Sequence, residues 1–268
     1  RTSFSSLQMD GRHYLDSHGV EDAIRVALSK VLKDKPTDPV TALGLLLSAK
    51  KVLIIATSSS AMGDHITGAW SEEISGPYYT FTDAGCDVTI ASVQGGKVPI
   101  DAASLSGDFK TENDKRFEST GDVLRLETSV PLASVALAQF DIVFLAGGHG
   151  TCVDFPEGAA QIVTDAYAAG KVVGAVCHGP MGLINATDGS KPLVTGKKVC
   201  GFSNVEEGQV GLTEKVPFLL EEKLKELGAT YVSADAWSET AIADGKLVTG
   251  QNPQSSVKCA KLCLEAAA

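Results

Sequence analysis

The sequence predicts an α/β protein: a doubly wound parallel sheet with helices on both faces, preceded by a short all-α helical hairpin. Three observations support this prediction. Short runs that are apolar on both faces occur at residues 52–57, 141–146 and 172–176, as in the central strands of parallel sheets. Helical patterns alternate with these runs, and glycines interrupt the chain after them. The first 50 residues, in contrast, carry helical periodicity only.

The composition restricts the class of protein. The chain has 268 residues, of which 44% are hydrophobic, enough for one sizeable domain with an appendage. The sequence shows neither an apolar run of membrane-spanning length nor a signal-peptide pattern at its start. The formal net charge of −10 disfavours binding to nucleic acid or to an anionic membrane. The six cysteines form no metal-ligand pattern, so we expect reduced thiols, a cytoplasmic location, and no metal or other cofactor.

The N-terminal part divides into a polar tail, residues 1–12, and a helical segment, residues 13–49. Lys35-Pro36 ends a first helix, and Asp38 with Pro39 offers an N-cap and first helical residue for a second. Two such helices cannot bury their apolar faces against each other alone, so we expect them to pack on the main domain or on a second copy. The apolar stripe of the first helix consists of Val20, Ala23, Ile24, Ala27, Leu28, Val31 and Leu32.

Three short motifs mark this segment: His-Tyr-Leu-Asp at 13–16, Lys-Pro-Thr-Asp-Pro-Val at 35–40 and Leu-Leu-Leu at 45–47. Through them, residues 13–48 resemble the dumpy-type relative of the docking-and-dimerisation motif of protein kinase A regulatory subunits. The resemblance implies a homodimer whose four-helix groove binds an amphipathic helix of a scaffold protein. It also implies a place in a scaffolded assembly such as the ciliary or flagellar axoneme. The alternative is a helical hairpin packed on its own domain.

The rest of the chain, residues 50–268, alternates between strands and helices. We expect an insertion with one short helix at 94–138, and a kink at Gly76-Pro77 within a helix. The further elements that the pattern predicts are strands at 88–92, 199–202 and 247–249 and helices at 70–81, 157–170, 181–186, 213–227 and 255–266.

A cysteine and a histidine, Cys177 and His178, directly follow the apolar run 172–176. A strand, a sharp turn and a helix with a nucleophile on the turn form a nucleophile elbow, whose strained backbone exposes the reactive side chain. The positive end of a helix at 181–186 would favour a thiolate at Cys177. The alternative is a buried cysteine at a strand end, with the histidine capping the helix.

Glycines follow another predicted strand, at 147–150. The carboxyl ends of parallel strands share one sheet edge, where ligands of open α/β sheets bind. We therefore expect Gly148, His149 and Gly150 to contact the substrate, and the amides of Gly148 and His178 to form an oxyanion hole. His65, in contrast, is more typical of a surface loop than of a ligand.

Four motifs stand in a specific order: Ala-Gly-Gly-His-Gly at 146–150, Ala-Val-Cys-His-Gly-Pro at 175–180, Lys-Val-Cys-Gly-Phe-Ser-Asn-Val-Glu-Glu at 198–207 and Val-Thr-Gly-Gln-Asn-Pro at 248–253. Through them, the chain resembles the ThiJ/PfpI superfamily, and within it the branch of heat-shock chaperones and glutathione-independent glyoxalases (glyoxalase III). The resemblance implies a flavodoxin-like fold and a catalytic cysteine, histidine and downstream acid.

The resemblance assigns these roles to Cys177, His178 and Glu207, although the neighbouring Glu206 keeps the acid open by one position. It also implies a glutamate on the first helix that hydrogen-bonds the cysteine, which Glu73 matches better than Glu72. Glu207 would orient His178. Glu73, if buried, would keep its proton. Alternatively, either carboxylate faces solvent.

The function that this resemblance implies is conversion of a 2-oxoaldehyde such as methylglyoxal to a 2-hydroxy acid such as lactate, without glutathione. It would be a lyase of the hydro-lyase (D-lactate dehydratase) type. Consistent with the absence of a nicotinamide from that reaction, the chain has no complete dinucleotide-binding glycine fingerprint. Two alternatives remain: a chaperone or scaffold subunit with a retained pocket, and a cysteine hydrolase or peptidase.

Overall fold

The structure is a computed structural model that describes residues 20–268, without the side chains of 21–23, 45, 46 and 48. The chain forms two compact units that divide between Lys50 and Lys51. The predicted tail, residues 1–12, and the start of the predicted docking segment, residues 13–19, lie outside the described residues. No helix in residues 20–268 has the length and apolar character needed to cross a membrane.

The N-terminal unit contains two helices, α2 (Val20–Asp34) and α3 (Pro39–Ser48). Asp38 is the N-cap of α3, as predicted: its carboxylate accepts the backbone N–H of Thr41 at 3.0 Å. Five residues of the predicted stripe of α2 fall into two sets. Ala27 and Val31 are buried, whereas the exposed set comprises Ile24, Leu28 and Leu32.

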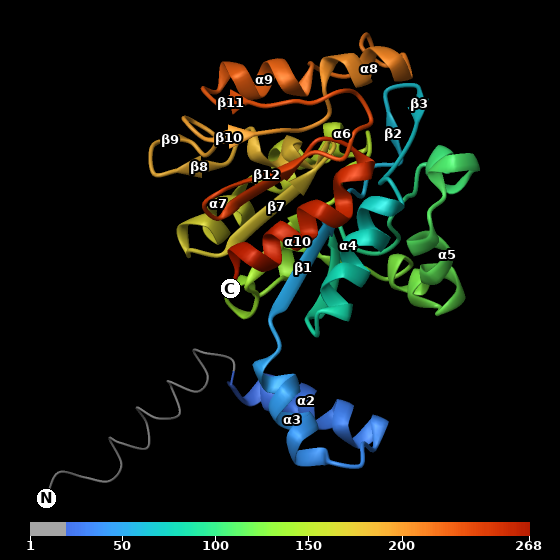
Figure 1. Cartoon of the computed structure of the whole chain (residues 1–268), viewed down its shortest axis with the longest axis vertical. Coiled ribbons are helices and arrows are strands. Elements are labelled where there is room, and N and C mark those ends of the chain that lie inside the picture. The colour runs from blue at the N-terminus through green and yellow to red at the C-terminus, as the bar shows by residue number, and fades with distance from the viewer. Residues whose placement is uncertain (1–19) are drawn as a thin grey trace, which may run out of the picture. The chain divides into compact units, whose positions relative to one another are not determined.

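The second unit is built on a seven-stranded sheet (Figure 1) in the order β12-β13-β7-β6-β1-β4-β5. All neighbouring pairs are parallel except β12 and β13, so the predicted α/β class is confirmed. The strands are β1 (Lys51–Ala56), β4 (Asp87–Ser92), β5 (Val130–Pro131), β6 (Ile142–Leu145), β7 (Val172–Val176), β12 (Ala241–Asp244) and β13 (Leu247–Gly250).

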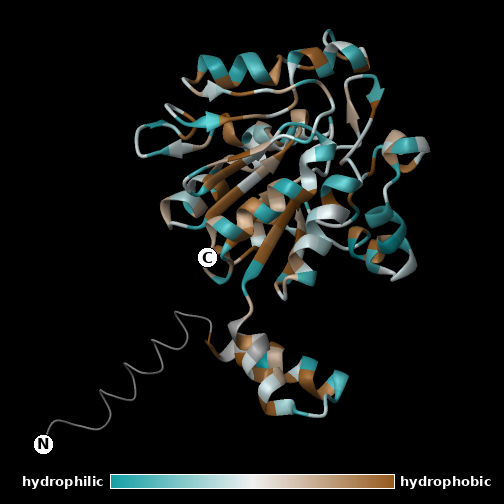
Figure 2. Ribbon diagram, viewed as in Figure 1, coloured by the Kyte–Doolittle hydropathy of each residue, from teal (hydrophilic) through white to brown (hydrophobic). Residues whose placement is uncertain are grey.

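Helices cover both faces of this sheet (Figure 1). On one face α4 (Glu72–Asp83) packs beside α10 (Ser256–Ala266), and on the other lie α6 (Thr151–Gly158) and α7 (Ala160–Ala168). Figure 2 shows the result: strands in the hydrophobic colour at the centre, and helices with mixed colours around them. Every residue of β6 and β7 is buried, because a parallel sheet covered on both faces has no solvent-facing side.

Three predicted helices differ from the structure. The helix expected at 157–170 begins earlier and divides into α6 and α7 at Ala159. The helix expected at 213–227 is α9 (Leu220–Glu226), since Pro217 lacks the N–H that an earlier helix would need. The helix expected at 181–186 is a 3-10 turn, η6 (Gly179–Leu183), packed so closely on β6 that a Cβ at Gly182 would lie 2.3 Å from Leu145.

The strand expected at 199–202 is also shorter. Only Lys198–Val199 (β10) pairs, and it pairs with Thr230–Tyr231 (β11) outside the main sheet. The backbone beyond β10 bonds to the elbow instead: the N–H of Phe202 donates to the carbonyl of Cys177 at 2.9 Å.

The insertion at 94–138 contains the expected short helix, α5 (Glu112–Ser119), together with 3-10 turns and the edge strand β5. The other elements that the sequence pattern missed are the strands β11 and β12, the helix α8 (Asn204–Val210), the hairpins β2 (Ala61–Met62) with β3 (His65–Ile66) and β8 (Thr187–Asp188) with β9 (Lys191–Pro192), and the 3-10 turns η1 (Ala102–Leu105), η2 (Gly107–Phe109), η3 (Asp122–Leu126), η4 (Leu132–Ser134), η5 (Leu137–Gln139) and η7 (Pro253–Ser255).

Candidate active site

Cys177 occupies the turn directly after β7, where its φ is +58°. A non-glycine residue in this left-handed region costs on the order of 1–3 kcal/mol, and such strain concentrates at functional sites. Hydrogen bonds on both sides hold the turn: the N–H of Cys177 donates to Gly250 at 3.0 Å, and its carbonyl accepts from Phe202 at 2.9 Å. The strained turn expected from the sequence is therefore present, but Cys177 is only 4% exposed, so the expectation that the turn exposes its side chain was wrong.

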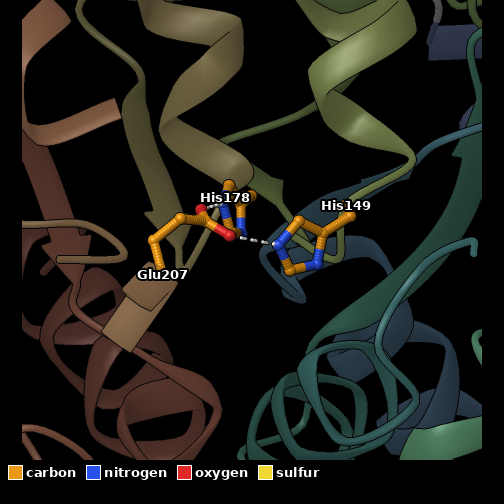
Figure 3. Close-up of side chains that lie close together, drawn as sticks. All are labelled: His149, His178 and Glu207. Carbon is orange, nitrogen blue, oxygen red and sulfur yellow. Dashed lines mark hydrogen bonds and ion pairs between the residues drawn. The ribbon is translucent and has the colours of Figure 1, made fainter. Parts of the chain in front are cut away.

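His178, Glu207 and His149 form a buried cluster at this turn, and all three side chains point toward one another in Figure 3. One carboxylate oxygen of Glu207 lies 2.8 Å from Nε2 of His178, and the other lies 2.9 Å from Nε2 of His149. His178 follows β7, His149 precedes α6, and Glu207 lies in the first turn of α8. Three separate chain segments therefore meet at one carboxylate.

The partners of Glu207 determine its charge. Burial alone would raise the pKa of Glu207, but the hydrogen bonds from His149 and His178 outweigh burial and lower the pKa to about 2. Glu207 is thus a carboxylate at neutral pH and can only accept hydrogen bonds. It follows that Nε2 of each histidine carries a hydrogen.

His178 is the neighbour of the candidate nucleophile. Burial and the proximity of His149 lower the pKa of His178, while Glu207 opposes this shift. The imidazole is therefore neutral at pH 7, and because Nε2 carries its hydrogen, Nδ1 has a free lone pair. Nδ1 lies 3.6 Å from Sγ of Cys177. This arrangement suits a base that removes the thiol proton.

Glu73 reaches the same turn from α4 and is fully buried. One of its oxygens accepts the N–H of Gly147 at 2.7 Å. The other oxygen is buried and interacts with the thiol of Cys177, with no further hydrogen-bond partner in the described chain. Burial raises the pKa of Glu73 to about 8, although the hydrogen bonds to Cys177 and Gly147 oppose the shift. Glu73 is mostly protonated at pH 7 and can donate a hydrogen bond to the sulfur.

The resting state of Cys177 differs from the thiolate expected from the sequence. Burial and the proximity of Glu73 raise the pKa of Cys177 well above that of a free thiol. The 3-10 turn η6 has five residues, and it replaces the α-helix whose positive end was expected to stabilise the charge. Cys177 therefore rests as a thiol, and the thiolate has to form by proton transfer.

The structure separates the two glutamates in each ambiguous pair. Glu206 does not reach the histidines; its carboxylate accepts the side chain of Asn252 at 2.8 Å and the N–H of Trp237 at 2.9 Å. The carboxylate of Glu72 accepts hydrogen bonds from the side chains of Thr111 and Asn113, the latter at 3.2 Å. The structure therefore brings Glu73 to Cys177 and Glu207 to the two histidines, whereas Glu72 and Glu206 bond to other groups.

The glycine loop before α6 approaches the site closely. A Cβ at Gly147 would lie 2.5 Å from the carboxylate of Glu73 and 2.7 Å from the amide nitrogen of His178, so only glycine fits. Gly148 has a φ of +94°, and its N–H acts to lower the pKa of the Cys177 thiol, against the larger opposite effect of burial. An oxyanion hole formed by the amides of Gly148 and His178 stays a prediction.

A cavity of about 330 Å³ opens onto Cys177, Gly148 and His149. His65, which the sequence assigned to the surface, lines this cavity, and its ring packs edge-on against His149 with centroids 6.3 Å apart. Gly150, which was expected to contact the substrate, is not among the residues that line the cavity, and a Cβ there would meet the carbonyl of Ser59 at 2.5 Å. Sequence reasoning missed the hydrogen bond of His149 to Glu207; the only signal for it was the position of His149 after a neighbouring strand.

The same cluster is the candidate for a metal site. Among residues 20–268, the group of histidine and acidic side chains that could share an ion is His149, His178 and Glu207, whose ligand atoms lie within 4.8 Å of one another. A metal would need the lone pair of each Nε2, whereas each Nε2 carries the hydrogen that it donates to Glu207. The arrangement therefore suits proton transfer better than metal binding.

The chain is similar to several known proteins. The sequence profile of the DJ-1/PfpI family matches residues 65–266. Glyoxalase 3 of Candida albicans is 33% identical over 73% of this chain and 87% of its own. The glutathione-independent glyoxalase HSP31 of Saccharomyces cerevisiae is 33% identical over 82% of this chain and 99% of its own.

Two solved structures are similar as well. The crystal structure of glyoxalase III from Candida albicans superposes with a TM-score of 0.75 at 31% identity, covering 81% of this chain and 97% of that one. The 24 kDa Rapid Encystment Protein of Francisella tularensis superposes with a TM-score of 0.77 at 39% identity, covering 82% of this chain and 99% of that one.

Proposed function

This chain belongs to the DJ-1/PfpI family, and from that premise we propose that it is a glutathione-independent glyoxalase. The reaction converts methylglyoxal or another 2-oxoaldehyde and water to a 2-hydroxy acid, D-lactate in the case of methylglyoxal. Viewed in the reverse direction it is a dehydration, which makes the enzyme a lyase of the hydro-lyase type. The catalytic residues are Cys177, His178, Glu207 and Glu73.

The reaction begins with formation of the thiolate. Nδ1 of His178 takes the proton of Cys177, and the sulfur adds to the aldehyde carbon to give a hemithioacetal. The negative charge that develops on the aldehyde oxygen is stabilised by the amides of Gly148 and His178. Glu207 balances the charge of the imidazolium, as the acid of a catalytic triad does.

Proton transfers then oxidise the former aldehyde carbon and reduce the neighbouring carbon of the substrate. A proton leaves the former aldehyde carbon and, through an enediol, a proton returns to the neighbouring carbon. His178 moves these protons, and Glu73, with its pKa of about 8, supplies or accepts one at neutral pH. Water hydrolyses the resulting thioester and releases the acid and the Cys177 thiol. Because one substrate carbon is oxidised and its neighbour reduced, no external electron acceptor enters.

One observation carries this proposal: a strained elbow cysteine has a neutral, correctly oriented imidazole on one side and a protonated carboxyl group on the other. A simple acyl-transfer enzyme needs the first of these groups. The second gives the site an acid at the sulfur, which isomerisation between two carbons also requires.

The test is incubation of the full chain with methylglyoxal in the absence of glutathione, with lactate measured by chiral chromatography. We expect steady lactate formation by the wild type and none above background by Cys177→Ala. The matched control is Cys86→Ala, because Cys86 precedes β4, outside the lining of the cavity, and should leave the rate unchanged. A folded wild type that forms no lactate would contradict the proposal and favour the chaperone, scaffold or hydrolase alternatives.

A second part of the proposal concerns residues 13–48, which we assign to dimerisation and to docking on an amphipathic helix of a scaffold protein. In support, Ile24, Leu28 and Leu32 are 45%, 45% and 65% exposed and recur every four residues along one face of α2. Exposed apolar faces of this kind mark interaction sites. Such docking would hold the cytoplasmic enzyme in an assembly such as the ciliary or flagellar axoneme.

This docking role predicts a change in mass. Sedimentation velocity of the full chain should give a smaller assembly for Leu28→Asp than for the wild type, with lactate formation retained. Lys30→Asp is the matched control, because Lys30 is exposed on the same helix but outside the apolar face. Equal masses for Leu28→Asp and the wild type would contradict dimerisation through α2.

A further inference from the structure

The cavity above Cys177 is larger and more aromatic than methylglyoxal needs. Its volume is about 330 Å³, at the lower end of the range of about 300–1,000 Å³ that holds drug-sized ligands. Methylglyoxal has a three-carbon skeleton and would leave most of this space to water. The aromatic side chains of the lining are Trp70, Phe109, Phe202 and Trp237.

These four rings form a continuous wall. The ring centroids of Trp70 and Phe109 are 5.2 Å apart, and those of Phe202 and Trp237 are 5.7 Å apart, each pair edge-to-face. Phe109 and Trp237 join the two pairs at 6.5 Å. Each ring comes from a different chain segment, so the wall is a product of the tertiary fold. Faces and edges at these distances can accommodate a further aromatic ring.

The charges around the cavity disfavour anionic substrates. No lysine or arginine is among its lining residues in the described chain, and the acidic one is Asp101. Asp101 already accepts the hydroxyl of Thr67 at 2.7 Å and the N–H of Ala103 at 2.9 Å. A phosphate or carboxylate on the substrate would therefore lose its hydration without gaining a cation. A neutral apolar substituent has no such cost.

Trp237 is held in its place in the wall. Its φ of +64° is strained for a residue with a bulky side chain. The carboxylate of Glu206 accepts its backbone N–H at 2.9 Å, and Gln209 accepts its indole N–H at 2.5 Å. Both partners lie on α8, the helix that also carries Glu207. The same element therefore positions the catalytic carboxylate and this part of the substrate wall.

On the basis of the proposed glyoxalase activity, we infer that the preferred substrates are 2-oxoaldehydes with an aromatic or bulky apolar substituent, and that Trp237 is a residue that determines this specificity. The aldehyde carbon would react with Cys177 while the substituent packs against the wall. The chemistry balances as for methylglyoxal: the aldehyde carbon is oxidised, the ketone carbon reduced, and one water consumed. Phenylglyoxal, an aryl 2-oxoaldehyde, would give mandelate.

The test compares phenylglyoxal with methylglyoxal on the full chain without glutathione, with mandelate and lactate measured by chromatography. We expect kcat/KM for phenylglyoxal to exceed that for methylglyoxal by about tenfold or more, because a phenyl group buries far more apolar area than a methyl group. Phenylglyoxal also modifies arginine side chains, but this reaction yields no mandelate. Cys177→Ala provides the background.

Trp237→Gly tests the wall directly, since glycine adopts the positive φ without strain. We expect the ratio of the two kcat/KM values to fall by about tenfold. This ratio does not depend on the fraction of correctly folded protein, because both substrates are measured on one sample. Phe218→Leu is the matched control, since Phe218 lies outside the lining of the cavity and should leave the ratio unchanged.

The outcomes separate this inference from the proposed function. Lactate formation with equal or lower kcat/KM for phenylglyoxal would overturn the inference and leave the glyoxalase proposal intact. An unchanged ratio in Trp237→Gly would overturn the role of Trp237. Formation of neither acid by folded wild type would overturn both the proposed function and the inference that rests on it.

Discussion

The first turns of α4 and α8 each carry two adjacent glutamates, Glu72 with Glu73 and Glu206 with Glu207, and all four are buried. In each pair the second glutamate reaches the candidate site and the first holds a neighbouring loop. Successive residues on a helix point about 100° apart. One residue of each pair therefore faces the sheet edge, and its neighbour cannot.

The two site glutamates behave in opposite ways. Burial raises the pKa of Glu73 to about 8, because its partners are a backbone N–H and a thiol. Burial acts on Glu207 in the same direction, but the hydrogen bonds from the histidines His149 and His178 reverse the result and lower its pKa to about 2. The comparison teaches that burial alone does not set the charge of a carboxyl group; the partners at its oxygens do.

The largest effect on the rate should follow from replacing Glu207, the charged one of the two site glutamates. We expect Glu207→Gln to lower kcat for lactate formation by about 10³–10⁴-fold. An amide can donate a hydrogen bond, so His178 could adopt the tautomer that presents N–H, in place of a lone pair, to Cys177. The rate is measured on variants whose fold is checked by near-UV circular dichroism. A folded Glu207→Gln within tenfold of the wild type would show that the carboxylate does not orient His178.

Replacing Glu73, the neutral one of the two site glutamates, should lower kcat less. We expect Glu73→Gln to lower kcat by about 10²-fold, because glutamine can replace the hydrogen bonds to Gly147 and Cys177 but cannot exchange a proton. The neighbouring Glu72→Gln is the matched control and should stay within about threefold of the wild type. If the two variants had equal kcat, Glu73 would have no role in proton transfer.

Much of this fold could be predicted from the sequence because its signals are local. The central strands are continuous apolar runs, and the elbow Cys177-His178 directly follows one of them. The N-cap of α3 needs only Asp38 and the residues after it. The divided helix at Ala159 and the 3-10 turn at Gly179–Leu183 could not be predicted, because both depend on packing against β6 and its surroundings.

The catalytic cluster could be predicted only in part, since its contacts join distant segments. Glu73 meets Gly147, which is 74 residues away, and Glu207 meets His149, which is 58 residues away. The choice between Glu206 and Glu207 depends on the orientation of α8, a helix that the sequence pattern did not predict. The aromatic wall has no sequence signal, because Trp70 and Trp237 become neighbours of the same cavity only in the folded chain.

The opposite pKa shifts also predict opposite effects of pH on stability. The pKa of Glu73 is raised in the folded state, so its contribution is present below pH 4.5 and is lost as pH rises to about 8. The pKa of Glu207 is lowered, so its contribution is present above pH 4.5 and is lost as pH falls to about 2.

Urea unfolding across this pH range tests both statements. Relative to Glu73→Gln, the wild type should lose a few kcal/mol of unfolding free energy between pH 5 and about pH 8. Relative to Glu207→Gln, it should instead lose its advantage below pH 4.5. The difference between wild type and variant cancels the titration of other groups. Parallel curves for either pair would contradict the corresponding shift.

The smallest effect should follow from replacing Glu206, whose hydrogen bonds stabilise the fold and which takes no part in the proposed reaction. Its two oxygens accept hydrogen bonds from Ser203, Trp237, Gln251 and Asn252. Glutamine keeps one acceptor oxygen but places an amide against at least one of these donors, so we expect Glu206→Gln to lower the free energy of unfolding by about 1–3 kcal/mol.

Thermal and urea unfolding at neutral pH measure this loss, with the exposed Glu214→Gln as a control that should change stability by less than about 0.5 kcal/mol. Because Glu206 anchors the N–H of Trp237, the tryptophan fluorescence of Glu206→Gln should also shift before unfolding begins. A stability equal to that of Glu214→Gln would mean that α8 and the Trp237 turn are stable without Glu206. The first glutamate of each pair would then no longer be the structural one and the second the catalytic one in both pairs.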